Sequence, residues 1–324
     1  MQLSGQYPPS VALIIAAYNA ESFIARAVRS ALAEAEVAEV IVVDDASTDG
    51  TVKCAQEADD GSGRLRVLVQ PQNAGPSAAR NRAIRESTAP WIGILDADDF
   101  LLPGRTRGLL AYTDKADFIA DDLWQAAEDN VNGPLRSMLG ETLENPSPVG
   151  FKTFVLANVT QKDRSRRELG FIKPIMRRSF LETHNIRYQE PMRLGEDYEL
   201  YTRALASGAR LLLVPAQGYV SVVRANSLSA RHSETDLLRL RDCDDALRDI
   251  PSLSKDDRAA LRQHYLSVDC RLQWRLLINA VKKRDAVAAL RTFLRPWPVP
   301  LYNMQQLLEQ LYLRTIASRR NPPV

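Results

Sequence analysis

Four short apolar runs, separated by stretches of helical periodicity, fill the first hundred residues and constrain the fold more than any other feature. They cover residues 11–16, 40–43, 65–69 and 91–95. Runs of this length without a regular polar–apolar alternation are typical of strands buried on both faces, as in parallel sheets covered by helices. The sequence therefore predicts an α/β fold with a mostly parallel sheet between helices.

Helix signals occupy the stretches between these runs. Residues 21–35 repeat apolar side chains at helical spacing, and residues 76–87 begin with a proline in the first turn. Further along, residues 117–120 and 211–214 are predicted as strands and residues 196–207 as a helix. Strands thus continue to alternate with helices through the middle of the chain.

The 324 residues are enough for one large α/β domain and a smaller appendage. From about residue 234, charged and leucine-bearing helical patterns replace the alternation of strands and helices. We predict an α/β domain over residues 1–233, which divides at about residue 115 into two halves. A helical region over residues 234–324 follows it.

Composition excludes several classes of protein. The net charge of +2 provides no strong field for nucleic acid. Cys54, Cys243 and Cys270 lie far apart, which argues against a disulfide framework and a zinc site. The first ten residues lack the apolar core of a signal peptide, and no apolar run approaches the roughly 20 residues that span a bilayer. We expect a cytoplasmic protein, either free or attached peripherally to the inner membrane.

An acidic stretch, Asp96-Ala97-Asp98-Asp99, follows the fourth apolar run. Carboxylates packed on one loop repel each other unless a cation joins them, and hard divalent ions prefer oxygen ligands. Such an ion would neutralise a diphosphate leaving group. The alternative is a helix N-cap, since aspartates also accept hydrogen bonds from free backbone N–H groups. The position at a strand end, one strand from a second acidic pair, favours a metal site.

That second pair is Asp44-Asp45, which follows the run at residues 40–43. We assign Asp44 and Asp49 to a turn that starts the next helix. Asp45 is assigned to a nucleotide base, because a carboxylate can accept the imide N–H of uracil. In parallel sheets, ligands bind beyond the carboxyl ends of the strands, so both acidic groups are expected at one crevice.

Two further segments could bind a pyrophosphate. Gly75 precedes a helix that carries Arg80, which together make a platform for an anion. A basic, hydroxyl-rich loop from Arg224 to His232 could fold over the same group, although polar loops also carry basic residues for solubility.

Glu196 and Asp197 begin the helix predicted at residues 196–207. A carboxylate there could remove the proton of an attacking hydroxyl. Acidic residues are also common at helix N-termini because they interact favourably with the helix dipole, and the sequence alone leaves both interpretations open.

The C-terminal region pairs apolar and basic side chains, among them Trp274, Leu277, Val281, Lys282 and Lys283. We expect its helices to pack on the domain or on a second subunit. Contact with an anionic membrane surface is the alternative.

Taken together, these residues resemble those of family 2 inverting glycosyltransferases of the GT-A fold. Within that family, the pattern from Gly195 to Leu205 followed by the serine-rich loop is similar to bacterial exopolysaccharide enzymes of the succinoglycan type. The matching stretches are Ala16-Ala17-Tyr18-Asn19, residues 42–51, Asn73-Ala74-Gly75 with Ala79-Arg80-Asn81, Asp96-Ala97-Asp98-Asp99 and Gly195-Glu196-Asp197.

The resemblance implies a GT-A sheet, Mg²⁺ or Mn²⁺ as cofactor, glucose from UDP-glucose as donor and a lipid-linked oligosaccharide as acceptor. It also implies a β-glycosidic product, and a division of the domain into a nucleotide half of about residues 1–115 and an acceptor half of about residues 116–233. Asp197 would be the general base, and Asp98 and Asp99 would be metal ligands. The residues implied at the donor nucleotide are Ala16, Tyr18, Asp45, Gly75, Arg80, Asp96, Asp98, Arg224 and His232.

Three alternative functions fit the sequence less well than a glycosyltransferase. A sugar nucleotidyltransferase needs a glycine-rich basic loop after the first strand, where this chain has Ala16-Ala17-Tyr18-Asn19. A dehydrogenase needs a G-x-G-x-x-G motif at the same place. A non-catalytic scaffold of a polysaccharide assembly would not require the acidic positions that this chain retains.

Overall fold

The computed structural model describes residues 10–140, 143–159, 169–224 and 233–320, with the side chains of residues 314–320 excepted. The chain divides into two compact units, residues 1–230 and residues 231–324. Strands occur in the first unit, and the described part of the second is helical.

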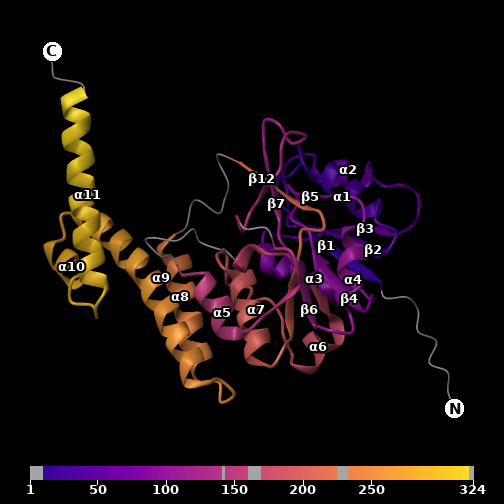
Figure 1. Cartoon of the computed structure of the whole chain (residues 1–324). Coiled ribbons are helices and arrows are strands. Elements are labelled where there is room, and N and C mark those ends of the chain that lie inside the picture. The colour runs from indigo at the N-terminus through magenta and orange to yellow at the C-terminus, as the bar shows by residue number, and fades with distance from the viewer. Residues whose placement is uncertain (1–9, 141–142, 160–168, 225–232, 321–324) are drawn as a thin grey trace. The chain divides into compact units, whose positions relative to one another are not determined.

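An eight-stranded sheet forms the centre of the first unit (Figure 1). Its strands lie in the order β3-β2-β1-β4-β10-β6-β11-β9. Neighbours from β3 to β4 are parallel, as are β6 and β11, whereas β10 and β9 run antiparallel to their neighbours. The prediction of a mixed, mostly parallel sheet is confirmed. The strands are β1 (Val11–Ala17), β2 (Val37–Asp44), β3 (Leu65–Val69), β4 (Trp91–Ile94), β6 (Phe118–Asp121), β9 (Ser147–Val149), β10 (Ile175–Arg177) and β11 (Leu211–Val214).

A second sheet has four strands in the order β5-β12-β7-β8. They are β5 (Phe100–Leu101), β7 (Trp124–Ala127), β8 (Arg136–Ser137) and β12 (Tyr219–Val223). The helices of the first unit are α1 (Ile24–Leu32), α2 (Thr51–Gln56), α3 (Pro76–Glu86), α4 (Arg105–Leu110), α5 (Phe151–Ala157), α6 (Arg178–Thr183) and α7 (Glu196–Ala206), with a 3₁₀ turn at Leu169–Phe171.

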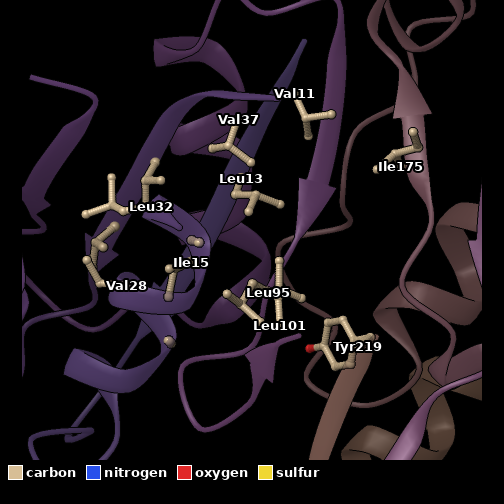
Figure 2. Close-up of a cluster of buried hydrophobic side chains, with 14 of the residues drawn as sticks. Val11, Leu13, Ile15, Val28, Leu32, Val37, Leu95, Leu101, Ile175 and Tyr219 are labelled. Atoms are coloured by element: carbon tan, nitrogen blue, oxygen red, sulfur yellow. The ribbon is translucent and has the colours of Figure 1, made fainter. Parts of the chain in front are cut away.

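Side chains of β1 lie at the centre of the core. Every residue from Val11 to Ile15 is at most 1% exposed, as expected for a strand covered on both faces. Figure 2 shows Val28 and Leu32 of α1 beside side chains of β1 and β2, with Leu95 and Tyr219 toward the carboxyl end of β1. This end of the sheet also carries the acidic loops.

Four helices make up the described part of the second unit: α8 (Glu234–Arg248), α9 (Lys255–Lys282), α10 (Ala286–Arg291) and α11 (Val299–Arg320). The first two begin with capping boxes, in which Ser233 and Ser254 exchange hydrogen bonds with the third helical residue. Asp269 of α9 is 1% exposed and accepts hydrogen bonds from Arg241 and Arg295, which ties the helices together. Among the described residues, no helix has both the length and the apolarity needed to cross a bilayer.

Candidate active site

The carboxyl ends of β2, β1 and β4 lie side by side, so the loops that follow them meet. The backbone N–H of Asn19 donates to the Ser47 hydroxyl over 2.9 Å, and the backbone N–H of Thr48 donates to the side-chain Oδ1 of Asn19 over 2.9 Å. Tyr18, between these loops, is 48% exposed and Ala16 is partly buried. Tyr18 is therefore accessible to a ligand at this edge of the sheet.

Asp45 links the loop after β2 to the start of α3 through hydrogen bonds. Its carboxylate accepts the backbone N–H groups of Ala74 and Gly75, each over 2.8 Å, and the Gln70 amide over 2.6 Å. The residue is 3% exposed. A carboxylate has about four acceptor positions, so these three hydrogen bonds leave about one for a nucleotide base. The contact with uracil stays a prediction.

The turn before α2 forms as its sequence suggests. Asp44 accepts the Ser47 amide over 3.0 Å, and Asp49 accepts the Thr51 amide over 3.0 Å. Gly75 caps α3 with a φ of +92°, a left-handed conformation that glycine adopts without a steric penalty. The N–H groups of Ala74 and Gly75 at the start of α3 are the ones that donate to Asp45.

The three aspartates of the acidic stretch point to different partners. Asp98 pairs with Arg224, and its side chain is 25% exposed. Asp99 accepts the Tyr219 hydroxyl over 2.9 Å and the Val222 amide over 2.8 Å, and it is 4% exposed. Asp99 thus has the surroundings of a buried structural carboxyl, which do not fit its predicted role as a metal ligand.

Asp96 belongs to a closed arrangement of charges that we call the ion cluster. Each of its two carboxylates places one oxygen against each of its two cations. The cluster consists of Asp96 after β4, Arg80 of α3, Lys173 before β10 and Asp197 of α7.

The contacts of the ion cluster are short and largely buried. Lys173 Nζ lies 3.0 Å from Asp96 Oδ2 and 2.7 Å from Asp197 Oδ2. Arg80 lies 2.9 Å from Asp96 Oδ1 and 3.3 Å from Asp197 Oδ1. Both cations are 5% exposed and Asp197 is 7% exposed. The cluster therefore holds two aspartates, 101 positions apart in the sequence, at a fixed separation.

Two further side chains border the ion cluster. Glu196 accepts from Arg80 over 3.0 Å, and the Tyr188 hydroxyl donates to Asp197 Oδ1 over 3.0 Å. The Arg80 guanidinium also stacks over the Tyr188 ring at 5.3 Å. The described hydrogen bonds of Arg80 go to three carboxylates of the protein, so in this structure Arg80 holds those side chains together. Its direct contact with a nucleotide stays a prediction.

Burial and neighbouring charges together determine the pKa values of Asp96, Lys173 and Asp99. Burial by itself raises the pKa of Asp96, but Lys173 and Arg80 outweigh it and lower that pKa from 3.8 to about 2. Burial lowers the pKa of Lys173, yet Asp197 and Asp96 outweigh it and raise that pKa above its ordinary value. For Asp99, burial and the charges of Asp96 and Asp98 act together and raise the pKa to about 8. The neighbouring cations thus favour the ionised form of Asp96, whereas burial and the nearby carboxylates favour the protonated form of Asp99.

The sequence predictions did not include Lys173, Tyr188 and Tyr219. Lys173 had a detectable signal, since it is the one charged residue in the otherwise apolar stretch Phe171–Met176. A lysine in such a place needs a carboxylate partner when it is buried. His232, which was predicted at the pyrophosphate, lies outside the described residues.

The chain is similar to a known family and to two curated proteins over most of its length. Residues 12–180 match the family Glycosyl transferase family 2. The succinoglycan biosynthesis protein ExoU of Rhizobium meliloti (strain 1021) is 47% identical over 277 residues, covering 84% of this chain and 79% of that protein. ExoO of the same organism, also a succinoglycan biosynthesis protein, is 33% identical over 302 residues, covering 88% and 81%.

The fold has counterparts among solved structures. A crystal structure of S. aureus TarS 1–349 in complex with UDP-GlcNAc has a TM-score of 0.63 at 17% identity, over 86% of this chain and 89% of that chain. At this identity the likeness shows the fold alone, and it confirms the fold class expected from the sequence. By its match over residues 12–180 and its identity to ExoU and ExoO, the chain belongs to glycosyl transferase family 2.

Proposed function

We propose that this glycosyltransferase transfers a hexose, glucose from UDP-glucose, to a hydroxyl group of a growing, lipid-linked exopolysaccharide oligosaccharide. Two relatives that match most of the chain are named for succinoglycan biosynthesis, which supports an exopolysaccharide product. A TarS structure with the same fold is a complex with UDP-GlcNAc, which supports a UDP-sugar donor.

The observation that carries the proposal is the position of Asp197. The ion cluster holds this carboxylate beside Asp96, at the strand ends where α/β sheets bind nucleotides. A base and a donor site must lie close together for direct displacement, because the acceptor oxygen and the anomeric carbon have to meet. Arg80 and Lys173 provide that proximity.

In the proposed reaction, Asp197 accepts the proton of the acceptor hydroxyl as the acceptor oxygen bonds to the anomeric carbon. The bond from that carbon to the diphosphate oxygen breaks at the same time, and UDP leaves with the bonding electrons. Attack opposite the leaving group inverts the anomeric centre, so an α-linked donor gives a β-glycoside. Tyr188 and Lys173 orient the Asp197 carboxylate through hydrogen bonds of 3.0 and 2.7 Å.

Asp98 is the residue that we assign to Mg²⁺ or Mn²⁺. Its carboxylate has one cationic partner, Arg224, whereas Asp96 is held by two cations and Asp99 is buried. Among the described residues, no group of three or more acidic, histidine or cysteine side chains is arranged to hold a metal. One carboxylate fits ions that keep several waters and complete their shell with substrate phosphates. A bound ion would supply positive charge to the departing diphosphate.

Release of UDP by the purified protein, with UDP-glucose and a lipid-linked oligosaccharide acceptor, tests the proposal. We expect Asp197→Asn to lower kcat by 10²-fold or more, as for loss of a general base. Glu182→Gln, which changes an exposed acid of α6, is the matched control and should leave kcat unchanged. Turnover of Asp197→Asn at the wild-type rate would remove the base assignment.

The donor and the metal are tested separately by thermal unfolding with a set of nucleotide sugars, because a ligand that binds the native state raises Tm. We expect UDP-glucose to raise Tm only with Mg²⁺ or Mn²⁺ present, and Asp98→Asn to abolish that dependence. A shift with UDP-glucose but no turnover with any acceptor would favour a non-catalytic scaffold. An equal shift without metal would remove the role of Asp98.

A further inference from the structure

Large apolar side chains are exposed in one part of the second unit, on α10, on α11 and on the turn between them. Seven of them are each 60% exposed or more, and we call them the α10–α11 patch: Val287, Leu290, Leu294, Trp297, Leu308, Leu311 and Tyr312. Scattered exposed leucines are ordinary, but seven large apolar side chains exposed within one segment, two of them aromatic, mark an interaction surface.

The patch follows the geometry of α11. Val299 and Asn303 at its start are fully buried, which shows that the first turn packs within the second unit. Leu308, Leu311 and Tyr312 are three and four positions apart, so they share one face of the helix, and that face is exposed. Figure 1 shows the later turns of α11 extending past α10. The exposed face is therefore presented outward by an anchored helix.

The segment that carries the patch is basic. Residues 281–320 contain eight lysines and arginines against two acidic residues, a net charge of +6. Since the whole chain carries +2, the remaining residues sum to −4. Lys282, Lys283 and Arg291 are exposed at the ends of α9 and α10. Positive charge is thus concentrated in the same segment of the chain as the exposed apolar side chains.

The combination of exposed apolar side chains and positive charge indicates which partner binds the patch. A second copy of the chain would bring two faces of equal positive charge together, which is repulsive. An anionic lipid surface attracts lysine and arginine side chains, accepts apolar side chains below the headgroups and favours tryptophan and tyrosine at the boundary. We propose that the α10–α11 patch binds the surface of an anionic membrane.

The segment for which the sequence left membrane contact open, around Trp274 to Lys283, divides in the structure. Leu277 is 4% exposed, whereas Val281 is 61% exposed beside the basic end of α9. The lipid contact therefore belongs to residues after Val281. It does not depend on the proposed function.

Co-sedimentation of the full chain with vesicles tests the proposal, using equal parts of phosphatidylglycerol and phosphatidylcholine against phosphatidylcholine alone. We expect binding to the anionic vesicles that weakens as salt is added, because surface charge is screened. Replacing Lys282, Lys283 and Arg291 by glutamine should lower the partition coefficient on the order of 100-fold, at about fivefold for each charge. Replacing Lys53, Arg85 and Lys115, which are exposed in the first unit, removes the same charge and should have no effect.

A second variant tests the apolar side chains. Leu308→Gln, Leu311→Gln and Tyr312→Ser change exposed residues, so circular dichroism and Tm should match the wild type while vesicle binding falls at least tenfold. Equal binding to both vesicle types, or equal loss in the first-unit control, would overturn the proposal. So would sedimentation equilibrium showing that the wild type self-associates without lipid and that the apolar variant does not, since the patch would then bind a second copy.

Discussion

Lys173 provides the most direct test of the ion cluster, because replacing it by methionine keeps most of the length of the side chain and removes its charge and its N–H donors. In the wild type, its ammonium group lies 2.7 Å from Asp197 and 3.0 Å from Asp96. In Lys173→Met, one oxygen of each aspartate loses its cation while remaining in the protein. Arg80 alone would then balance three carboxylates, since Glu196 also bonds to it.

The expected cost follows from burial. Removing one partner of a buried ion pair destabilises a protein by about 3–5 kcal/mol, because the remaining charge stays desolvated. The Asp197 side chain is 9% exposed and fits that case, but the Asp96 side chain is 32% exposed and is partly solvated. We therefore expect Lys173→Met to lower the free energy of unfolding by about 3 kcal/mol at pH 7.

The pKa of Asp96 predicts how the stability difference between wild type and Lys173→Met changes with pH. The wild-type pKa of Asp96 is lowered from 3.8 to about 2, so its contribution to stability is present above 3.8 and is lost as the pH falls toward 2. Without Lys173 much of that lowering disappears. The stability difference between wild type and Lys173→Met should consequently shrink as the pH falls through this range.

Urea unfolding at several pH values, followed by circular dichroism, measures the difference. Lys53→Met is the control, since Lys53 is 78% exposed and its pair with Glu57 should contribute at most about 0.5 kcal/mol. A deficit for Lys173→Met below 1 kcal/mol at pH 7, or one that grows toward low pH, would refute the reasoning.

Three further substitutions test other parts of the site and the sheet. Asp45→Asn should cost about 2 kcal/mol in urea unfolding, because one of two backbone N–H groups loses its acceptor. Gly93→Ala should cost about 1–3 kcal/mol, since its Cβ would lie 2.8 Å from Leu13 Cδ2, whereas Gly150→Ala meets no atom within 4 Å and should be neutral in the same assay. Arg80→Lys should lower Tm despite keeping the charge, because an ammonium group cannot reproduce the planar contacts to three carboxylates.

Much of the nucleotide half could be predicted because its strands are long and apolar. The run at residues 65–69 coincides with β3, and the run at residues 11–16 extends by one residue to give β1. The run at residues 40–43 lies inside β2, which begins three residues earlier and ends one residue later. Placing Asp45 and Asp96 at the same edge of the sheet then requires only the rule for ligand sites in parallel sheets.

The acceptor half was less predictable, because its strands are short and their partners are distant in the sequence. β10 has three residues, Ile175–Arg177, yet it lies antiparallel between β4 and β6 and so brings Lys173 to Asp96. A three-residue strand has no detectable periodicity. The same holds for the role of Asp99, which depends on β12: once Tyr219 and Val222 of that strand donate to it, an apparent metal ligand becomes a buried structural carboxyl.

The ion cluster also bears on how the proposed reaction would be balanced electrostatically. With Glu196 included, two cations face three carboxylates, so the group carries a net charge of −1. If Asp197 takes the acceptor proton, that net charge becomes zero at the moment when negative charge develops on the departing diphosphate. Lys173 and Arg80 each contact both aspartates. Once the proton neutralises Asp197, the positive charge of these two residues is less compensated and stabilises the negative charge of the diphosphate near Asp96 more strongly. Replacing either cation should consequently lower kcat more than it raises KM, since the benefit arises only as the proton and the leaving group move.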